Sequence, residues 1–229
     1  MTVRIPATRE AFAAVPLAVA PRLLDAHLIT EVDGERVVLR ITEVEAYHGR
    51  GTGDVPDPGS HARMGPTARN ATMWGEPGHL YVYLSHGIHS CVNVVCAPEG
   101  VAGGVLLRAA EVLEGADAAL RRRTARGVVR SPRDLARGPG RLGDASGLRY
   151  PRHDGIDAVT GAEHAGASAT LLLRTDPLPA VATGPRVGVA GVAGTADFPW
   201  RFWIPGDETV SPFRWGRGAA DASSSPHLP

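Results

Sequence analysis

Two carboxylates and a phenol lie two residues apart in the segment 37–47. This segment is dense in β-branched residues and follows a turn signal, a pattern that predicts a strand. Side chains two apart on one face lie about 7 Å apart, so we expect the two carboxylates to interact and the more buried one to have a raised pKa. A carboxylate placed in this way suits a general base, whereas two acids that face water or pair with arginines would be purely structural. The face predicted by strict alternation holds Val37, Leu39, Ile41, Glu43, Glu45 and Tyr47.

A second group of aromatic residues follows later in the chain. Residues 80–84 and 88–96 are strand-like runs separated by Ser85-His86-Gly87, which predicts a hairpin. Alternation places Tyr81 and Tyr83 on one face, close to the turn. Aromatic faces beside a hairpin tip are what a protein needs to receive an unstacked base and fill the gap that it leaves. Two tyrosines on a strand can equally be core residues.

Histidines are concentrated within forty-two residues, at positions 48, 61, 79, 86 and 89. His86 and His89 have His-x-x-His spacing, but they lie across a predicted turn and not on a helix. The sequence has no HExxH or CxxC companion, so we expect no metal, with a metal-dependent hydrolase as the alternative. Some of these rings are instead expected to stack or hydrogen-bond in a pocket with the tyrosines.

The charged residues have an unusual composition. All 24 basic residues are arginine, which excludes chemistry that needs a lysine amine, such as a Schiff base, a P-loop lysine or a PLP lysine. The net charge is zero, but residues 121–152 hold ten arginines against Asp134 and Asp144. This stretch is either a phosphate-binding patch or a solvated helix face.

The remaining patterns indicate a single α+β domain over residues 1–215 and a disordered tail over 216–229. A length of 229 residues suits one large domain, and the long Gly- and Pro-rich loop 49–78 suggests function. Further elements are expected as a short helix within 10–29, a strand at 105–108, a helix at 109–124, irregular chain over 127–170, strands at 170–174 and 187–192, and an apolar run at 200–204.

Location and redox state follow from what the chain lacks. Cys91 and Cys96 have neither the number nor the spacing of a disulfide framework or a zinc knuckle. The apolar run 11–20 is broken by Pro16 and adjoins Glu10, unlike a signal peptide. No stretch approaches the roughly 20 apolar residues of a membrane span. We therefore expect a cytoplasmic protein with no membrane partner.

Several motifs in sequence order make the chain resemble a known family, the alkyladenine (3-methyladenine) DNA glycosylases, over residues 12–212. The motifs are Glu43-Val44-Glu45-Ala46-Tyr47, His61, residues 66–74 (PTARNATMW), residues 77–84 (PGHLYVYL), Gly87, Cys91-Val92-Asn93-Val94, residues 105–109 (VLLRA), residues 138–142 (GPGRL), residues 185–189 (PRVGV), residues 199–203 (PWRFW) and Val210-Ser211. One such match could be chance, but so many in the same order are highly specific.

The resemblance implies a curved, mixed but mostly antiparallel sheet with surrounding helices and a hairpin inserted into DNA. It also implies a monomeric base-excision repair enzyme of bacterial type that acts on damaged double-stranded DNA of the chromosome. Such an enzyme flips an alkylated purine out of the duplex and hydrolyses its N-glycosidic bond, leaving an abasic site. An alkylated purine is already a good leaving group, so one carboxylate and an aromatic box suffice without cofactor or metal.

The same resemblance assigns roles to individual residues. Glu45 takes the position of the general base that activates water. The expected base pocket consists of Tyr47, His61, Tyr83, Asn93 and Leu106. The expected DNA-binding residues are His86, Arg108 and Arg141, with His86 where family members usually have a tyrosine wedge.

Besides His86, two departures from the family pattern bear on how far the resemblance extends. The family's Cys-x-Ala-Leu-Gly-Ile continuation is replaced by residues 143–148 (GDASGL), and the loop 49–60 carries extra Gly, Asp and Pro. The alternative from another class is a binding module that grips RNA or damaged DNA without chemistry. Because the chain has no lysine, we expect a glycosylase without lyase activity.

Overall fold

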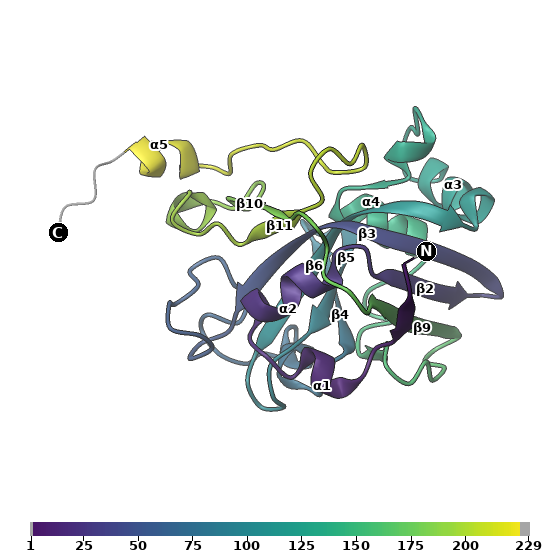
Figure 1. Ribbon diagram of the computed structural model, residues 1–229, viewed down its shortest axis with the longest axis horizontal. Coiled ribbons are helices and arrows are strands. Elements are labelled where there is room, and N and C mark those ends of the chain that lie inside the picture. Colours follow the sequence, from purple (N-terminus) through teal and green to yellow (C-terminus); the bar gives the residue numbers. More distant parts are fainter. Residues whose placement is uncertain (1, 225–229) are drawn as a thin grey trace.

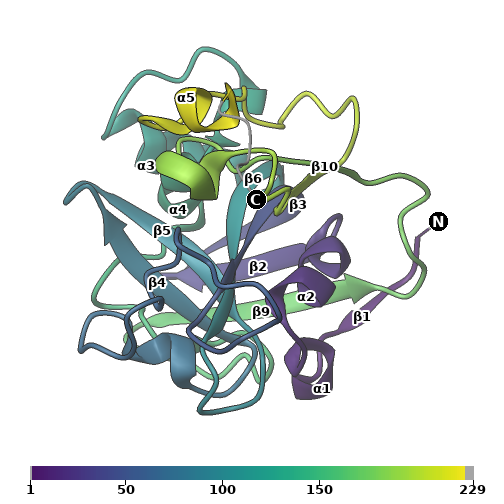
Figure 2. The same cartoon turned by 90° about the vertical axis from the view of Figure 1, so that its left-hand side faces the viewer.

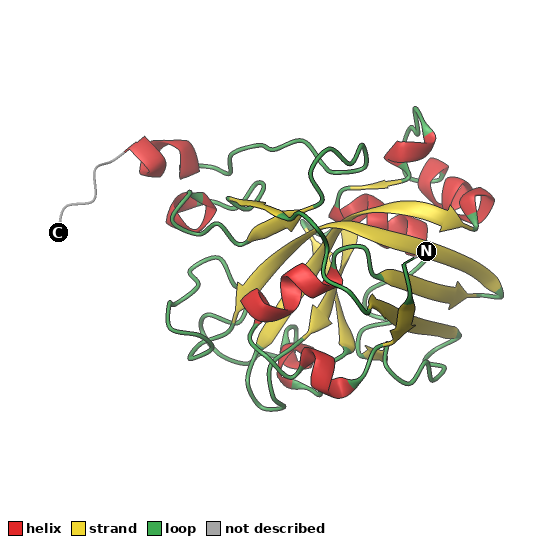
Figure 3. Ribbon diagram, in the orientation of Figure 1, coloured by secondary structure: helices red, strands yellow, loops and turns green. Residues whose placement is uncertain are grey.

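The structure, a computed structural model, describes residues 2–224 and is built around one curved sheet. Every strand pairing in that range is antiparallel, and the strands run in the order β1-β9-β2-β3-β6-β5-β4-β8, with β7 on β6 and β10–β11 on β3. Helices lie around the sheet (Figure 3), which confirms the α+β prediction. The strands are β1 (Arg4–Pro6), β2 (His27–Val32), β3 (Glu35–His48), β4 (His79–Ser85), β5 (His89–Val95), β6 (Gly103–Glu114), β7 (Ala136–Arg137), β8 (Ile156–Asp157), β9 (Ala167–Arg174), β10 (Ala182–Gly184) and β11 (Arg201–Trp203).

The helices are short and peripheral, as Figures 1 and 2 show. Helix α2 packs on β3, and α4 packs on β5 and β6. None of the helices within residues 2–224 has the length and apolar character needed to cross a membrane. The helical segments are α1 (Arg9–Phe12), α2 (Pro16–Leu23), α3 (Ala116–Thr124), α4 (Pro139–Ser146) and α5 (Ala219–Ser224), with 3-10 turns η1 (Ala71–Trp74), η2 (Pro132–Asp134) and η3 (Gly191–Gly194).

The prediction of a helix from residue 109 is wrong for its first turn and a half. Residues 109–114 continue strand β6, where Ala109 and Ala110 pair with β3 on one side and β7 on the other. Pairing on both edges overrides the helix propensity of this alanine- and glutamate-rich stretch. The helix begins only after Gly115, whose φ of 74° and close approach to the Arg36 carbonyl need a residue without a side chain.

Two other expectations fail near glycines. Residues 187–190 are a loop and residues 191–192 begin η3, so no strand forms here; Gly188 and Gly191, with φ of 72° and 61°, turn the chain. Conversely, α4 lies in the stretch expected to be irregular. The helix begins with Pro139 in its first turn and ends at Gly147, which has the left-handed conformation. The stretch lacks a periodic pattern of apolar residues, so the helix was not expected from the sequence.

Strand β3 changes its facing at a bulge. Ile41 pairs with Ala110 and Glu43 with Ala109, so Thr42 is an extra residue on β3. Before the bulge the odd-numbered side chains join the core, and after it Val44 and Ala46 do so. Beyond this point β11 replaces β2 as the partner on that edge of β3. The bulge therefore turns Glu43 and Glu45 away from the core that Ile41 faces, and the prediction of one continuous face is wrong.

The end of the described chain has structure. The sequence predicts a disordered tail from residue 216, whereas α5 spans Ala219–Ser224 and packs on η3 (Figure 2). Ala219 is fully buried, because a small side chain fits against Gly194. Residues 225–229 of the predicted tail lie outside the described residues.

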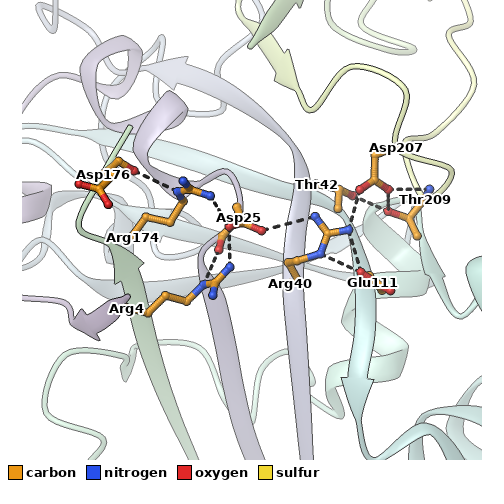
Figure 4. A network of polar contacts seen from close by, with 9 residues as sticks. All are labelled: Arg4, Asp25, Arg40, Thr42, Glu111, Arg174, Asp176, Asp207 and Thr209. Atoms are coloured by element: carbon orange, nitrogen blue, oxygen red, sulfur yellow. Dashed lines mark hydrogen bonds and ion pairs between the residues drawn. The ribbon is translucent and has the colours of Figure 1, made fainter. Parts of the chain in front are cut away.

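A network of arginines and carboxylates fastens the ends of the chain to the sheet (Figure 4). Asp25 pairs with Arg4 of β1, with Arg174 of β9 at 2.8 Å and with Arg40 of β3 at 3.5 Å. Arg40 extends the network to Asp207 at 2.6 Å, and so holds the C-terminal loop against β3. Three arginines thus meet three carboxylates, counting Glu111, and the network is neutral.

We predict that Asp25→Asn lowers the free energy of unfolding by about 2 kcal/mol, because three largely buried arginines lose their shared charge partner. The substitution suits the backbone, since Asn tolerates the φ of 60° at this position. Asp33→Asn is the matched control, because Asp33 also has positive φ but makes an exposed pair with Arg152. We expect about 0.5 kcal/mol or less there. Chemical denaturation of both variants measures the difference, and equal losses would contradict the prediction.

Candidate active site

A cleft of about 1070 Å³ lies where the ends of β3, β4, β5 and β6 meet the loops that follow α3 and β10. All nine residues predicted for the site line it, although they come from segments up to 96 positions apart, from Glu45 to Arg141. They are Glu45, Tyr47, His61, Tyr83, His86, Asn93, Leu106, Arg108 and Arg141.

Glu45 is buried at the floor of the cleft and holds three contacts. Its Oε1 accepts a hydrogen bond of 2.7 Å from the Val187 amide and lies 3.5 Å from the Arg108 guanidinium, and its Oε2 accepts one of 2.9 Å from the Tyr47 hydroxyl. These contacts fix the orientation of the carboxylate, and Glu45 lines the cleft. An oriented, buried carboxylate beside a cavity is able to accept a proton from a bound molecule.

The nearby Glu43 is hydrogen-bonded to other residues and lies outside the cleft. It accepts hydrogen bonds from Arg201, from Arg108 at 3.1 Å and from the Ser211 amide at 2.9 Å. Arg108 therefore lies between the two carboxylates. Burial opposes the charge of Arg108, but Glu45 and Glu43 outweigh this effect and raise the pKa of its guanidinium. The sequence left open whether these two acids are purely structural and pair with arginines. Glu43 pairs with Arg108 and Arg201 and lies outside the cleft, whereas Glu45 pairs with Arg108 alone and lines the cleft.

Tyr47 lines the cleft, and the guanidinium of Arg186 packs against one face of its ring. The guanidinium of Arg186 lies 4.6 Å from the centre of its ring, and Arg186 is itself completely buried in a two-pronged ion pair with Asp57 at 2.8 Å. Burial and the Glu45 charge raise the pKa of Tyr47, so its phenol is neutral. Sequence reasoning missed the Arg186–Asp57 pair, because Asp57 lies in the loop without periodicity.

A second group of rings that lines the cleft comes from β4 and the long loop. His61 meets Tyr83 edge to face with 4.6 Å between ring centres, and Tyr83 stacks on Tyr81 at 5.4 Å. The prediction that the two tyrosines share a face is thus confirmed. Burial raises the pKa of Tyr83, whereas burial and the charges of Arg69 and Arg63 lower that of His61, so both rings are neutral near pH 7.

Asn93 and Leu106 lie side by side on the floor. They are cross-strand partners on β5 and β6, and Leu106 is also the partner of Glu45 on β3. The Asn93 amide donates to the Tyr81 carbonyl at 3.1 Å, which orients its side chain. Cross-strand pairing of β3, β6 and β5 therefore places the Glu45 carboxylate, the Leu106 side chain and the Asn93 amide in one row across the sheet.

The turn between β4 and β5 stands at the rim. His86 is exposed at its tip with φ of 50°, and its ring lies 3.0 Å from the Ser85 hydroxyl. Arg126 donates to the carbonyl of Ile88 in the same turn at 3.1 Å. The predicted hairpin is therefore present, and its tip is tied to the arginine-rich stretch.

The cleft is basic. Among the described residues, only two acids, Glu45 and Asp144, line it. The arginines that line it are Arg63, Arg69, Arg108, Arg123, Arg126, Arg137, Arg141 and Arg214. The stretch 121–152 supplies four of them, while other arginines of that stretch, such as Arg121 and Arg152, pair with acids elsewhere.

Asp144 of α4 organises this basic edge. Its buried carboxylate lies 2.9 Å from Arg149, 3.3 Å from Arg123 and 3.6 Å from Arg126. Arg141, on the same helix, is exposed and lies 3.6 Å from Asp134. Sequence reasoning recorded Asp144 only as an acid opposing the basic charge, since nothing in the pattern showed three arginines converging on it.

No group of three or more His, Cys, Asp or Glu within residues 2–224 is arranged to hold a metal ion. Burial raises the pKa of the Cys91 thiol in the cleft wall to about 11, so this sulfur is protonated at neutral pH. The cleft thus combines the oriented Glu45 carboxylate with neutral aromatic walls and a basic rim that Asp144 organises.

A sequence profile of the family described as methylpurine-DNA glycosylase (MPG) matches residues 10–208. The chain belongs to this family. It is therefore a DNA glycosylase, a hydrolase of DNA repair, and the resemblance found in its motifs is confirmed.

Individual relatives agree with this membership. Proteins named "putative 3-methyladenine DNA glycosylase" from Leifsonia xyli subsp. xyli, Streptomyces avermitilis and Nocardia farcinica are 52%, 49% and 46% identical to the chain. The alignments cover 90%, 92% and 91% of this chain and 92%, 93% and 92% of those proteins. The similarity thus extends over nearly the whole length of this glycosylase.

One buried histidine on β3 is expected to make the stability of the glycosylase depend on pH. His48 is buried at the end of β3 and stacks on Trp200 with 4.7 Å between ring centres. Burial lowers its pKa below the ordinary value of 6.5, with Asp57 opposing and Arg186 reinforcing this shift. The unfolded chain therefore takes up a proton at a higher pH than the folded one.

We predict that His48 contributes a loss of stability as the pH falls through about 6.5, at up to about 1.4 kcal/mol per pH unit, ending below the lowered folded pKa. His48→Phe keeps the ring stack and removes the titration. The unfolding free energy of this variant should fall less between pH 7 and pH 5 than that of the wild type. At pH 8, where His48 is neutral in both the folded and the unfolded chain, the difference between the two proteins measures the effect of the substitution on packing alone. Urea titrations at each pH measure this, and parallel curves would refute it.

Proposed function

We propose that the glycosylase excises alkylated purines, 3-methyladenine among them, from double-stranded DNA, with Glu45 activating the attacking water. The observation that carries the proposal is the orientation of the Glu45 carboxylate by Tyr47, Val187 and Arg108 at the floor of a basic, aromatic cleft. The names of the relatives support 3-methyladenine as a substrate.

In the proposed reaction the bond between C1′ of the sugar and the purine nitrogen breaks, and the base leaves with the bonding electrons. Glu45 takes a proton from water, and the water oxygen bonds to C1′. An alkylated purine carries positive charge, so accepting these electrons neutralises it and no acid has to protonate it. The carboxylate also lies where positive charge develops on the sugar.

The walls of the cleft suit a cationic base. Neutral Tyr47, Tyr83 and His61 present π-faces and edges without repelling charge, and a cation over an aromatic face is attracted to it. Arg186 occupies the space behind Tyr47, so the opposite face of that ring is the one proposed to stack on the flipped base. Asn93 and Leu106 would contact its edge.

We assign entry of the base to the hairpin and the basic rim. His86 at the exposed tip is proposed to occupy the gap left by the extruded nucleotide, and the arginines of the rim, Arg141 among them, to bind phosphates. Arg108, which lies deeper against both glutamates, is proposed to act on the sugar-phosphate of the flipped nucleotide. We expect the enzyme to act as a cytoplasmic monomer.

Glu45→Gln tests the chemistry. We predict a loss of base release of at least about 100-fold from DNA that holds 3-methyladenine, because the amide cannot take a proton from water. Binding of a duplex with an uncleavable abasic-site analogue should persist within about tenfold. Single-turnover release and fluorescence anisotropy measure the two quantities.

Glu99→Gln, an exposed glutamate outside the cleft, is the matched control and should match the wild type. Equal release by Glu45→Gln would overturn the role of Glu45. Tight binding of the abasic analogue by wild-type protein that releases no base at any pH would instead favour a binding module.

The absence of lysine gives a second prediction. A lyase needs an amine that forms a Schiff base with the abasic sugar, and this chain has no lysine side chain. Borohydride treatment of the enzyme with abasic DNA should therefore trap no covalent complex, and the abasic strand should stay intact. A trapped complex would contradict the monofunctional reaction.

A further inference from the structure

A short aromatic and basic segment borders the cleft after the family match ends. The match covers residues 10–208, and the residues Phe213–Arg217, here called the 213–217 segment, read Phe-Arg-Trp-Gly-Arg. Arg214 and Trp215 line the cleft that also holds Glu45. The bond-breaking and water-activation steps proposed above use neither side chain, and Trp215 has no role in them.

The backbone of the 213–217 segment is held at both ends. The backbone carbonyls of Arg214 and Arg217 accept hydrogen bonds of 2.9 and 3.0 Å from the amides of Gly188 and Gly191, respectively. Gly216 lies so close to the Val189 carbonyl that an added Cβ would be 2.0 Å from it. These anchors belong to the loop that begins at Val187, whose amide donates to Glu45. The segment is therefore placed in fixed relation to the carboxylate.

A second anchor lies just before the segment. The amide of Ser211 donates to Glu43 at 2.9 Å, and its hydroxyl accepts from Arg108 at 3.2 Å. The chain between Ser211 and Arg217 thus spans from the glutamate cluster to the Val187 loop. A ligand contacted by this chain would not have to order it first, which lowers the cost of binding.

The aromatic and arginine side chains of the segment, unlike its anchored backbone, are exposed to solvent. Phe213 and Trp215 are 37% and 45% exposed and meet edge to face at 4.8 Å. Within residues 2–224 no ion pair joins Arg214 or Arg217 to a carboxylate. Exposed aromatic rings next to an uncompensated guanidinium, in a basic cleft, are complementary to a nucleic-acid strand.

We propose that the 213–217 segment is a second DNA contact of the enzyme: Arg214 pairs with a phosphate and Trp215 packs on the adjoining deoxyribose of the strand that carries the extruded nucleotide. The strand is specified because the segment is anchored to the loop that orients Glu45, and Glu45 faces the sugar of that nucleotide in the proposed reaction. The inference rests on the proposed function for its choice of strand.

The test compares Arg214→Ala and Trp215→Ala with Arg217→Ala, which removes an equal charge from the same segment but from a side chain outside the cleft. The Kd for a duplex with an uncleavable abasic-site analogue is measured by anisotropy at several salt concentrations. We expect Kd to rise about fivefold or more for each of the first two variants. Arg214→Ala should also reduce the slope of log Kd against log salt by about one, and Arg217→Ala should change neither value by more than about twofold.

A fluorescence measurement on the intact enzyme gives an independent readout. Trp215 is the most exposed of the four tryptophans, so acrylamide should quench it readily in the free enzyme and much less in the DNA complex. Trp215→Phe, which keeps an apolar ring, should remove most of this DNA-dependent protection.

The outcomes separate this inference from the proposed function. Unchanged Kd and salt slope in Arg214→Ala and Trp215→Ala, with unchanged quenching on DNA binding, would overturn the second contact even if Glu45→Gln abolishes base release. Absence of base release by the wild type, with these binding effects present, would overturn the proposed reaction and leave the contact standing. Quenching protection that appears only with an added protein would assign the segment to a protein partner and refute the DNA contact.

Discussion

The site depends on burying two carboxylates two positions apart on one strand. Glu43 and Glu45 are both removed from water, and ionised carboxylates are stable there only with charged and hydrogen-bonding partners. Arg108 meets both of them, Arg201 and Ser211 complete the shell of Glu43, and Tyr47 and Val187 that of Glu45. Because these partners come from β6, β11 and the C-terminal loops, satisfying the carboxylates also assembles the cleft.

The bulge in β3 makes this arrangement possible. One extra residue, Thr42, changes the phase of the strand, so that the odd-numbered side chains of its first half face the core. Those of its second half leave the core: Glu45 and Tyr47 line the cleft, and Glu43 pairs with Arg108 and Arg201. The matching irregularity on β6 leaves Arg108 without a partner residue on β3 and directs it between the two acids. A single long strand thus serves both the core and the site.

Because the chain has no lysine, arginine supplies both the cations of its internal ion pairs and the positive charge of its cleft. Asp25 and Asp144 each gather three guanidiniums, and one cluster fastens the chain ends while the other borders the cleft (Figure 4 shows the first). A planar guanidinium donates in several directions, so several of them can share one carboxylate. Zero net charge therefore coexists with a strongly basic cleft.

The sequence alone determined the α+β class, the β4–β5 hairpin, the family and nine residues that line the cleft, because local alternation, turn residues and motifs record them. Only the tertiary structure decided what each glutamate does, since alternation gives Glu43 and Glu45 the same environment and the bulge and Arg201 distinguish them. The Arg186–Asp57 pair, the arginines around Asp144 and the placement of Arg214 and Trp215 were equally beyond reach. They join segments distant in the chain, and no local pattern encodes such a contact.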